Sequence, residues 1–183
     1  VATAGRAVFF SGLTVLLGIF VLGFLTALKP LGNYDWGWHL AGGRYIAEEG
    51  TVPHTDPFSF TMLGERWLTQ SWLAELLYSW GESNWGLGFV PPMMLLLSSI
   101  TFLGVGIVSY RRSRSEWSTA IILALTTLLM ISFLVPRPVL FSLALFALVV
   151  VAWDRPETRW TLPFLFWIWA SVHGSFAIGL AYV

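Results

Sequence analysis

The stretch LGFVPPMMLLLSSITFLGVGIVSYRRSR, residues 87–114, decides the class of protein to which this chain belongs. Its apolar part, 87–110, is long enough to cross the roughly 30 Å hydrocarbon core of a membrane as a helix. Two prolines fall in the opening turn of that helix, where a missing N–H group is tolerated. The basic sequence RRSR, 111–114, follows directly. A long apolar helix that ends in a basic cluster is typical of a transmembrane span whose end faces the cytoplasm.

The composition also indicates a membrane protein. Of the 183 residues, 56% are hydrophobic and 11% are charged, whereas soluble domains carry about 25% charged residues. The 11 Trp and 14 Phe residues provide the aromatic side chains that gather at lipid–water interfaces. Ten basic and ten acidic residues cancel, which argues against nucleic acid as a partner, and the lack of Cys excludes disulfides and thiolate metal sites. The sequence therefore predicts an all-α polytopic membrane protein.

We expect about five transmembrane helices, because four further apolar runs occur, at 7–28, 117–135, 139–153 and 160–183. The last run contains His173 and Gly174, and two half-helices broken at this point are an equal alternative. The chain then divides into three parts: 1–28 with the first transmembrane helix, a loop at 29–86, and 87–183 with the other four helices. Because the sequence starts at Val1 and stops within an apolar run, we expect a piece of a longer chain.

The distribution of basic residues predicts the orientation of the chain. Six arginines would lie on one side of the membrane: Arg6, Arg111, Arg112, Arg114, Arg155 and Arg159. The positive-inside rule makes this side, with the segment 111–114, cytoplasmic. The loop 29–86 then lies on the exoplasmic side, and its seven acidic residues outnumber its three basic ones.

The exoplasmic loop is predicted to carry two amphipathic helices. The first, DWGWHLAGGRYIAEE (35–49), has Asp35 as its N-cap and Gly50 just past its end. The second, TQSWLAELLYSW (69–80), carries an apolar stripe and ends at Gly81. Glu75 lies opposite that stripe, where we expect it to be solvated. An extended segment with two prolines joins the helices, which would lie in the membrane interface with their polar sides covering a cavity between the spans.

Three candidate site residues lie on the first loop helix. Asp35 and His39 are one helical turn apart, so both can face one cavity. Asp35 is either a general base or a helix cap, and His39 is either its partner or a residue that hydrogen-bonds at the interface. Arg44, on the same helix, is a further candidate for substrate binding.

Three more candidates lie elsewhere. Asp56 is either a second site carboxylate or a turn residue before a proline. Arg137, between two prolines, either pairs with an anion such as a lipid phosphate or extends toward the headgroups. His173, among small residues, either makes an interhelical hydrogen bond or contacts a ligand. The three histidines are scattered along the sequence, so we expect no dedicated metal centre.

Several short motifs follow one another in a characteristic order. An Asp just after the first span is followed by WHLAGGRYI (38–46), P-x-x-DPFSFT-x-x-G-x-x-W (53–67), WLAELLY (72–78), RP (137–138) and WASVHGSF (169–176). In this order they resemble bacterial polytopic proteins of the GT-C glycosyltransferase superfamily, of the protein-mannosyltransferase and aminoarabinose-transferase type (glycosyltransferase family 39-like). The resemblance covers about residues 7–180, and it is more specific for the fold than for the reaction.

The resemblance implies transfer of a sugar from a polyprenyl-phosphate donor on the outer face of the bacterial inner (cytoplasmic) membrane, often helped by a divalent cation. Asp35 would be the catalytic base, and we expect the substrate to be bound by His39, Arg44, Asp56, Arg137 and His173. Many family members carry an adjacent acidic pair after the first span, whereas Asp35 is followed by Trp36. A complete module has more spans and usually a distal periplasmic domain, so this N-terminal part alone is expected to be inactive.

A non-enzymatic interpretation competes with the transferase. The same spans suit an accessory or scaffold subunit of a larger membrane protein complex, with the aromatic residues of the loop as its docking surface. In one form of this alternative, His173 or another histidine contacts a pigment or haem. Membrane lipids are partners under either interpretation.

Overall fold

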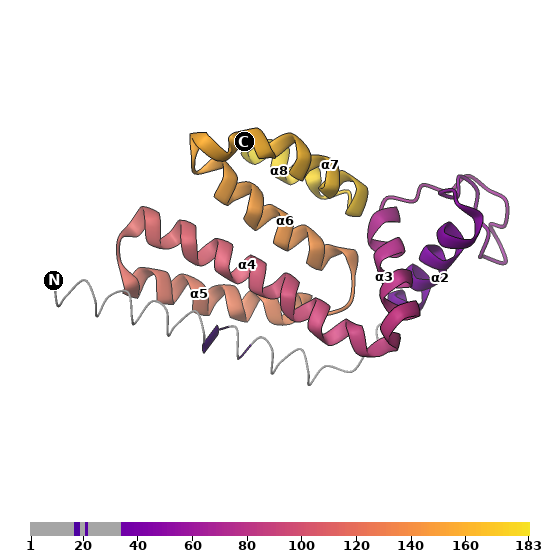
Figure 1. Ribbon diagram of the computed structural model, residues 1–183, viewed down its shortest axis with the longest axis horizontal. Coiled ribbons are helices and arrows are strands. Elements are labelled where there is room, and N and C mark those ends of the chain that lie inside the picture. Colours follow the sequence, from indigo (N-terminus) through magenta and orange to yellow (C-terminus); the bar gives the residue numbers. More distant parts are fainter. Residues whose placement is uncertain (1–16, 19–20, 22–33) are drawn as a thin grey trace.

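The computed structural model describes residues 17–18, 21 and 34–183, and in this part the chain folds into helices and their connections (Figure 1). The α-helices are α2 (Tyr34–Glu49), α3 (Trp72–Trp85), α4 (Val90–Ser113), α5 (Glu116–Met130), α6 (Pro138–Trp153), α7 (Leu162–Val172) and α8 (Phe176–Tyr182). Three 3₁₀ turns are η1 (Gly86–Phe89), η2 (Ile131–Phe133) and η3 (Pro156–Thr161). The predicted all-α class is confirmed for this part, and the first predicted span, 7–28, lies outside it except at three positions.

The helices form two groups. α4, α5, α6 and α7 lie side by side as a bundle, and α2 packs against α3 at one end of it (Figure 1). The segment between α2 and α3 is irregular, as its prolines predict, and it carries an isolated antiparallel bridge between Thr55 and Arg66. The turn η1 joins α3 to α4, so one helical segment, Trp72–Ser113, links the end group to the bundle.

Helix α3 continues past Gly81, where the sequence predicted its end. A Cβ atom at Gly81 would lie 2.5 Å from the ring of Phe89, so the lack of a side chain serves close packing there. The helix ends instead before Gly86, whose φ of 63° lies in the left-handed region that glycine adopts without strain.

Small and polar side chains bring the bundle helices together. Trp169 on α7 is buried and donates its indole N–H to the hydroxyl oxygen of Ser142 on α6 at 3.0 Å. Gly104 on α4 lies so close to α6 that an added Cβ atom would stand 2.9 Å from the Cβ of Ala147. Close backbone contact through small residues is a common way for helices to associate in a membrane, where the lipid removes much of the hydrophobic drive.

The last apolar run forms two helices. α7 ends at Val172, the chain turns at 173–175, and α8 returns beside α7 with Gly179 against the rings of Phe166 and Trp169. The broken alternative is therefore the observed one. The second half folds back along the first instead of continuing its direction.

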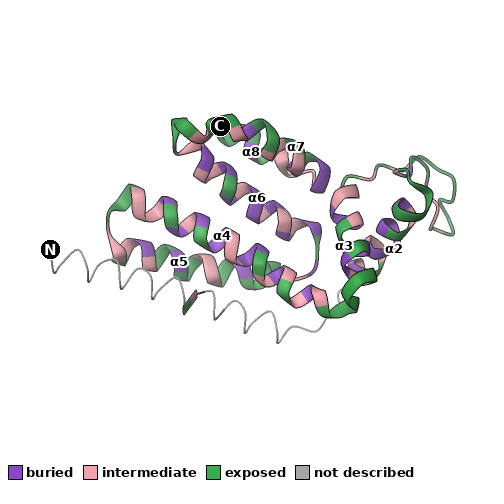
Figure 2. Cartoon of the chain, viewed as in Figure 1, coloured by how far each residue is buried: buried purple, intermediate pink, exposed green. Residues whose placement is uncertain are grey.

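Two helical segments of the described residues are long and apolar enough to cross a membrane, Trp72–Ser113 and Glu116–Phe133. α6 has 16 residues and α7 has 11, so both are shorter than a usual span. Only 17% of the apolar window in Glu116–Phe133 is buried, and Figure 2 shows that most of α5 is exposed or half-buried. Apolar surface of this extent is typical of helices that contact lipid or another protein. The arrangement with five spans stays a prediction.

Helices α2 and α3 pack through glycines and polar residues. Gly42 and Gly43 of α2 face Glu75 of α3, and a Cβ atom at Gly43 would overlap the carbonyl oxygen of Glu75. The buried face of α3 carries Ala74, Glu75, Tyr78, Ser79 and Gly81. The predicted apolar stripe is half-buried or exposed and consists of Trp72, Leu73, Leu76, Leu77 and Trp80. α3 therefore buries a face of small and polar residues together with Tyr78, and much of its apolar stripe is left outward.

The contact at Gly43 predicts a sharp difference between two glycines of α2. Gly43→Ala should force α2 away from α3 and lower the free energy of unfolding by about 1–3 kcal/mol. Gly37→Ala is the matched control, because a Cβ atom there meets nothing within 4 Å, and it should raise helix stability by up to about 1 kcal/mol. Thermal unfolding of both variants in detergent measures the difference. Equal melting temperatures would show that the two helices do not pack at Gly43.

Candidate functional site

A polar cavity of about 410 Å³ opens where the α2–α3 pair meets the bundle. α2 provides Asp35 and His39, and the α7–α8 turn provides His173. The remaining lining residues come from the start of α3 and from the connection between α5 and α6: Gln70, Ser71, Ser132, Phe133, Val135, Arg137, Pro138 and Val139. The fold thus brings four of the six predicted site residues, Asp35, His39, Arg137 and His173, into one cavity from distant parts of the sequence.

Asp35 and Arg137 form an ion pair across this cavity. Asp35 lies in the first turn of α2, where the helix dipole favours a negative charge. Arg137 precedes Pro138, the first residue of α6, and its extended backbone (φ −123°, ψ 153°) lies outside the helix. Both side chains are about half exposed. A carboxylate and a guanidinium therefore share one partly exposed polar cavity.

His39 pairs with Glu75, which the sequence predicts to be solvated. Its Nδ1 lies 3.0 Å from Oε1 of Glu75, and Glu75 is only 6% exposed. The expectation that Glu75 is solvated is therefore wrong. The carboxylate fits between the helices because Gly42 has no side chain: a Cβ atom there would stand 2.7 Å from Oε2 of Glu75.

His173 forms the turn between α7 and α8. Its Nδ1 accepts a hydrogen bond from the backbone N–H of Ser175 at 3.2 Å and lies 2.9 Å from the Ser175 hydroxyl. Because Nδ1 makes its hydrogen bonds within the turn, Nε2 is the ring nitrogen that is left to interact with a ligand in the cavity. The neighbouring Gly174 lets Gln70 approach, because an added Cβ atom would stand 2.9 Å from the Gln70 amide oxygen.

Arg44 and Asp56, the other two predicted site residues, do not line this cavity. Arg44 is exposed and pairs with Glu82 of α3 at 2.7 Å. Asp56 is buried in its own turn, where it accepts hydrogen bonds from the Ser59 hydroxyl and from the N–H groups of Phe58 (2.8 Å) and Ser59 (3.0 Å). The turn alternative for Asp56 is therefore the observed one, and Arg44 links α2 to α3.

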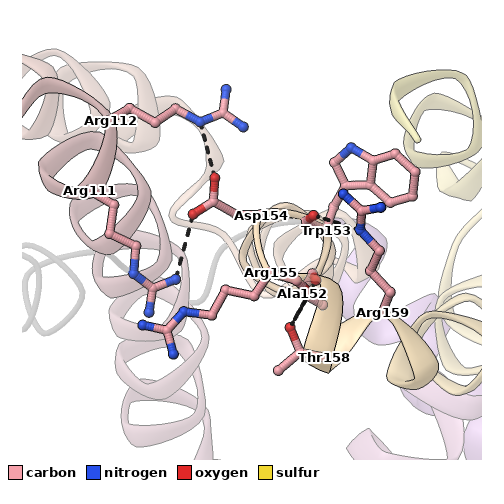
Figure 3. A network of polar contacts seen from close by, with 8 residues as sticks. All are labelled: Arg111, Arg112, Ala152, Trp153, Asp154, Arg155, Thr158 and Arg159. Carbon is pink, nitrogen blue, oxygen red and sulfur yellow. Dashed lines mark hydrogen bonds and ion pairs between the residues drawn. The ribbon is translucent and has the colours of Figure 1, made fainter.

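A second polar cluster lies at the opposite end of the bundle (Figure 3). Arg112 Nε donates to Asp154 at 3.2 Å and Arg111 lies 3.7 Å from the same carboxylate. Arg159 donates its Nε–H to the Trp153 carbonyl oxygen at 3.1 Å and stacks over the Trp153 ring. Five of the six arginines that the sequence assigns to one side of the membrane, those from Arg111 to Arg159, thus gather at one end, away from the cavity, and Arg6 lies outside the described residues.

Among the described residues no group of three or more His, Asp or Glu side chains is placed to hold a metal ion. In the cavity, Asp35 is paired with Arg137 and His39 with Glu75. This donor set does not fit the divalent cation that the family resemblance implies.

Comparison of the chain with protein-family models, with curated proteins and with solved structures finds no match. The GT-C resemblance therefore stays a prediction.

The turn at Asp56 predicts a response to acid. Hydrogen bonds from the Ser59 hydroxyl and from the N–H groups of Phe58 and Ser59 hold the pKa of Asp56 below its ordinary value of 3.8. Because the folded state has the lower pKa, these bonds stabilise the turn fully above the ordinary value and are lost as the pH falls through the lowered one. We expect protection of the Phe58 and Ser59 amides from hydrogen exchange to decrease in that acidic range.

Asp56→Asn should reduce the same protection already at neutral pH and remove its dependence on acid. Hydrogen exchange read by mass spectrometry measures both effects. Unchanged protection in Asp56→Asn would mean that the carboxylate does not hold the turn.

Proposed function

We propose that this chain is the N-terminal part of an integral membrane glycosyltransferase of the GT-C type, which takes its sugar from a polyprenyl-phosphate donor. The cavity carries this proposal, because it combines a carboxylate, a guanidinium and two imidazoles at one end of a bundle with apolar outer surfaces. A carboxylate can accept a proton from a sugar acceptor, and a guanidinium can bind a phosphate with two parallel hydrogen bonds.

In this proposal the protein lies in the bacterial inner membrane with about five spans. The segment 29–86 is exoplasmic and Arg111–Arg114 is cytoplasmic. The arginine cluster at the far end of the bundle supports this orientation, because the positive-inside rule places such clusters in the cytoplasm. The cavity then opens toward the outer leaflet, where the headgroup of a lipid-linked sugar would be found.

The ion pair suggests how the donor prepares the site. The donor phosphate binds Arg137 and weakens its contact with Asp35, which becomes available to the acceptor hydroxyl. The acceptor oxygen then forms a bond to the anomeric carbon of the sugar, and the bond from that carbon to the phosphate oxygen breaks. The phosphate leaves with the electron pair, stabilised by Arg137, and Asp35 takes the hydroxyl proton.

An apolar groove beside the cavity supports a lipid-linked donor. It has a volume of about 730 Å³ and runs along α3, η1 and α4, with Trp80, Trp85 and Leu96 among its lining residues. Phe141 of α6 lines the groove, and Pro138, about one turn earlier on the same helix, lines the polar cavity. A donor with an isoprenoid tail and a phosphate headgroup would match these two features, because its tail is apolar like the groove and its headgroup is polar like the cavity.

Asp35→Asn in the full-length protein tests the mechanism. Removal of the base should lower the rate of sugar transfer by about 100-fold or more. The probes are undecaprenyl phosphates that carry mannose, glucose or aminoarabinose, and the readout is undecaprenyl phosphate released, measured by mass spectrometry. Glu48→Gln is the matched control, because Glu48 is an exposed carboxylate on the same helix, and it should leave the rate unchanged.

Two results would remove the proposal. One is the lack of donor turnover by the wild-type protein with each of the three sugars. The other is equal turnover by Asp35→Asn and Glu48→Gln, provided that both variants melt at the wild-type temperature.

A further inference from the structure

Glu75 is a buried carboxylate for which the proposed reaction has no use. It is only 6% exposed, and it faces α2 at the two glycines that let the helices meet. A buried carboxylate is unfavourable unless a hydrogen-bond donor or a positive charge compensates it. Here the compensating group is the ring of His39, 3.0 Å away.

This contact determines which ring nitrogen of His39 is protonated and which one is left unprotonated. When Glu75 is ionised it can only accept hydrogen bonds, and Nδ1 of His39 is then the donor of this contact. In the neutral ring Nε2 is then the unprotonated nitrogen, and it points away from Glu75 because the two ring nitrogens lie on different sides of the imidazole. Since His39 lines the cavity together with Asp35, the geometry offers a proton acceptor there.

The proposed reaction releases a proton that such an acceptor can take up. After sugar transfer Asp35 holds the proton of the acceptor hydroxyl and is neutral. A neutral acid cannot form the ion pair with Arg137 that the structure shows, so Asp35 must lose this proton before the site returns to its resting state. His39 lies one helical turn from Asp35 on the same face of α2.

We propose that His39 and Glu75 form a proton relay that returns Asp35 to its ionised state after each transfer, an inference that rests on the proposed function. The proton moves from the Asp35 carboxyl to Nε2 of His39, and the imidazolium so formed is balanced by the Glu75 carboxylate. From Nε2 the proton passes to water in the open cavity. No electrons are exchanged, and the ring returns to its neutral form.

The groups around His39 are consistent with this role. Asp35 lies on its own helix, Glu75 and Tyr78 face it from α3, and Arg137 and His173 line the same cavity. Glu75 is a positioning residue, because it acts through the ring of His39 and does not line the cavity itself. Tyr78 is buried beside the pair, and its ring centre lies 6.3 Å from that of His39.

The test is chemical rescue in the full-length protein. His39→Ala should lower kcat for sugar release from the undecaprenyl-phosphate donors by about 100-fold, with little change in KM, because the relay acts after the donor has bound. Free imidazole in the buffer should restore a large part of the lost rate, since the deleted ring leaves space in an open cavity.

Two further variants make the result specific. Glu75→Gln should also lower kcat, but imidazole should not restore it, because the His39 ring still fills its place. His54→Ala is the matched control: His54 is an exposed histidine of the loop outside the cavity, and neither its loss nor added imidazole should change the rate.

A measurement on the resting protein tests the geometry without turnover. Nitrogen-15 NMR of labelled histidine should show His39 with a protonated Nδ1 and an unprotonated Nε2, assigned by loss of the signal in His39→Gln. The opposite tautomer would overturn the relay, as would full activity of His39→Ala. If Asp35→Asn is inactive while His39→Ala is fully active, the transferase stands without the relay, whereas a wild-type protein without turnover overturns both.

Discussion

The ion pair between Asp35 and Arg137 lies where the two parts of the molecule meet, since one partner belongs to α2 and the other precedes α6. A half-exposed pair contributes only about 0–1 kcal/mol to stability, so it does not hold the parts together. Apolar contacts do so, among them the ring of Tyr78 on α3 against Phe141 on α6, with centres 5.8 Å apart. The polar pair is therefore available for ligand exchange without loss of the fold.

Much of the helical structure follows from the sequence, because proline or charged residues at the ends of an apolar run limit where a helix can begin and end. The run 139–153 corresponds to α6, which starts one residue earlier at Pro138. The end of α3 was predicted at Gly81, but glycine ends a helix only where the backbone adopts a positive φ, as it does at Gly86. No local pattern distinguishes these two glycines, because the packing of Phe89 on Gly81 depends on the tertiary structure.

The site is predictable in part. The sequence predicts that Asp35 and His39 face one cavity, and it marks Arg137 and His173 separately as ionisable residues beside apolar runs. The cavity that unites all four depends on the packing of distant helices. Glu75 was missed because a carboxylate opposite an apolar stripe faces water in a soluble protein. In this chain much of the apolar stripe of α3 faces outward, and the face that carries Glu75 is buried. The adjacent glycines at 42 and 43 were the available signal, since they mark a close approach between helices.

The outward position of Trp80 and Trp85 has a consequence for how a substrate arrives. Their rings pack edge to face, 4.8 Å apart, on the same helix that buries Glu75. Indole rings prefer the level of the lipid headgroups, so this edge of α3 would fix the depth of the neighbouring opening in the bilayer. Under the proposed function, a tailed donor would then approach by lateral diffusion within one leaflet, and the encounter would depend on its surface density instead of its concentration in water.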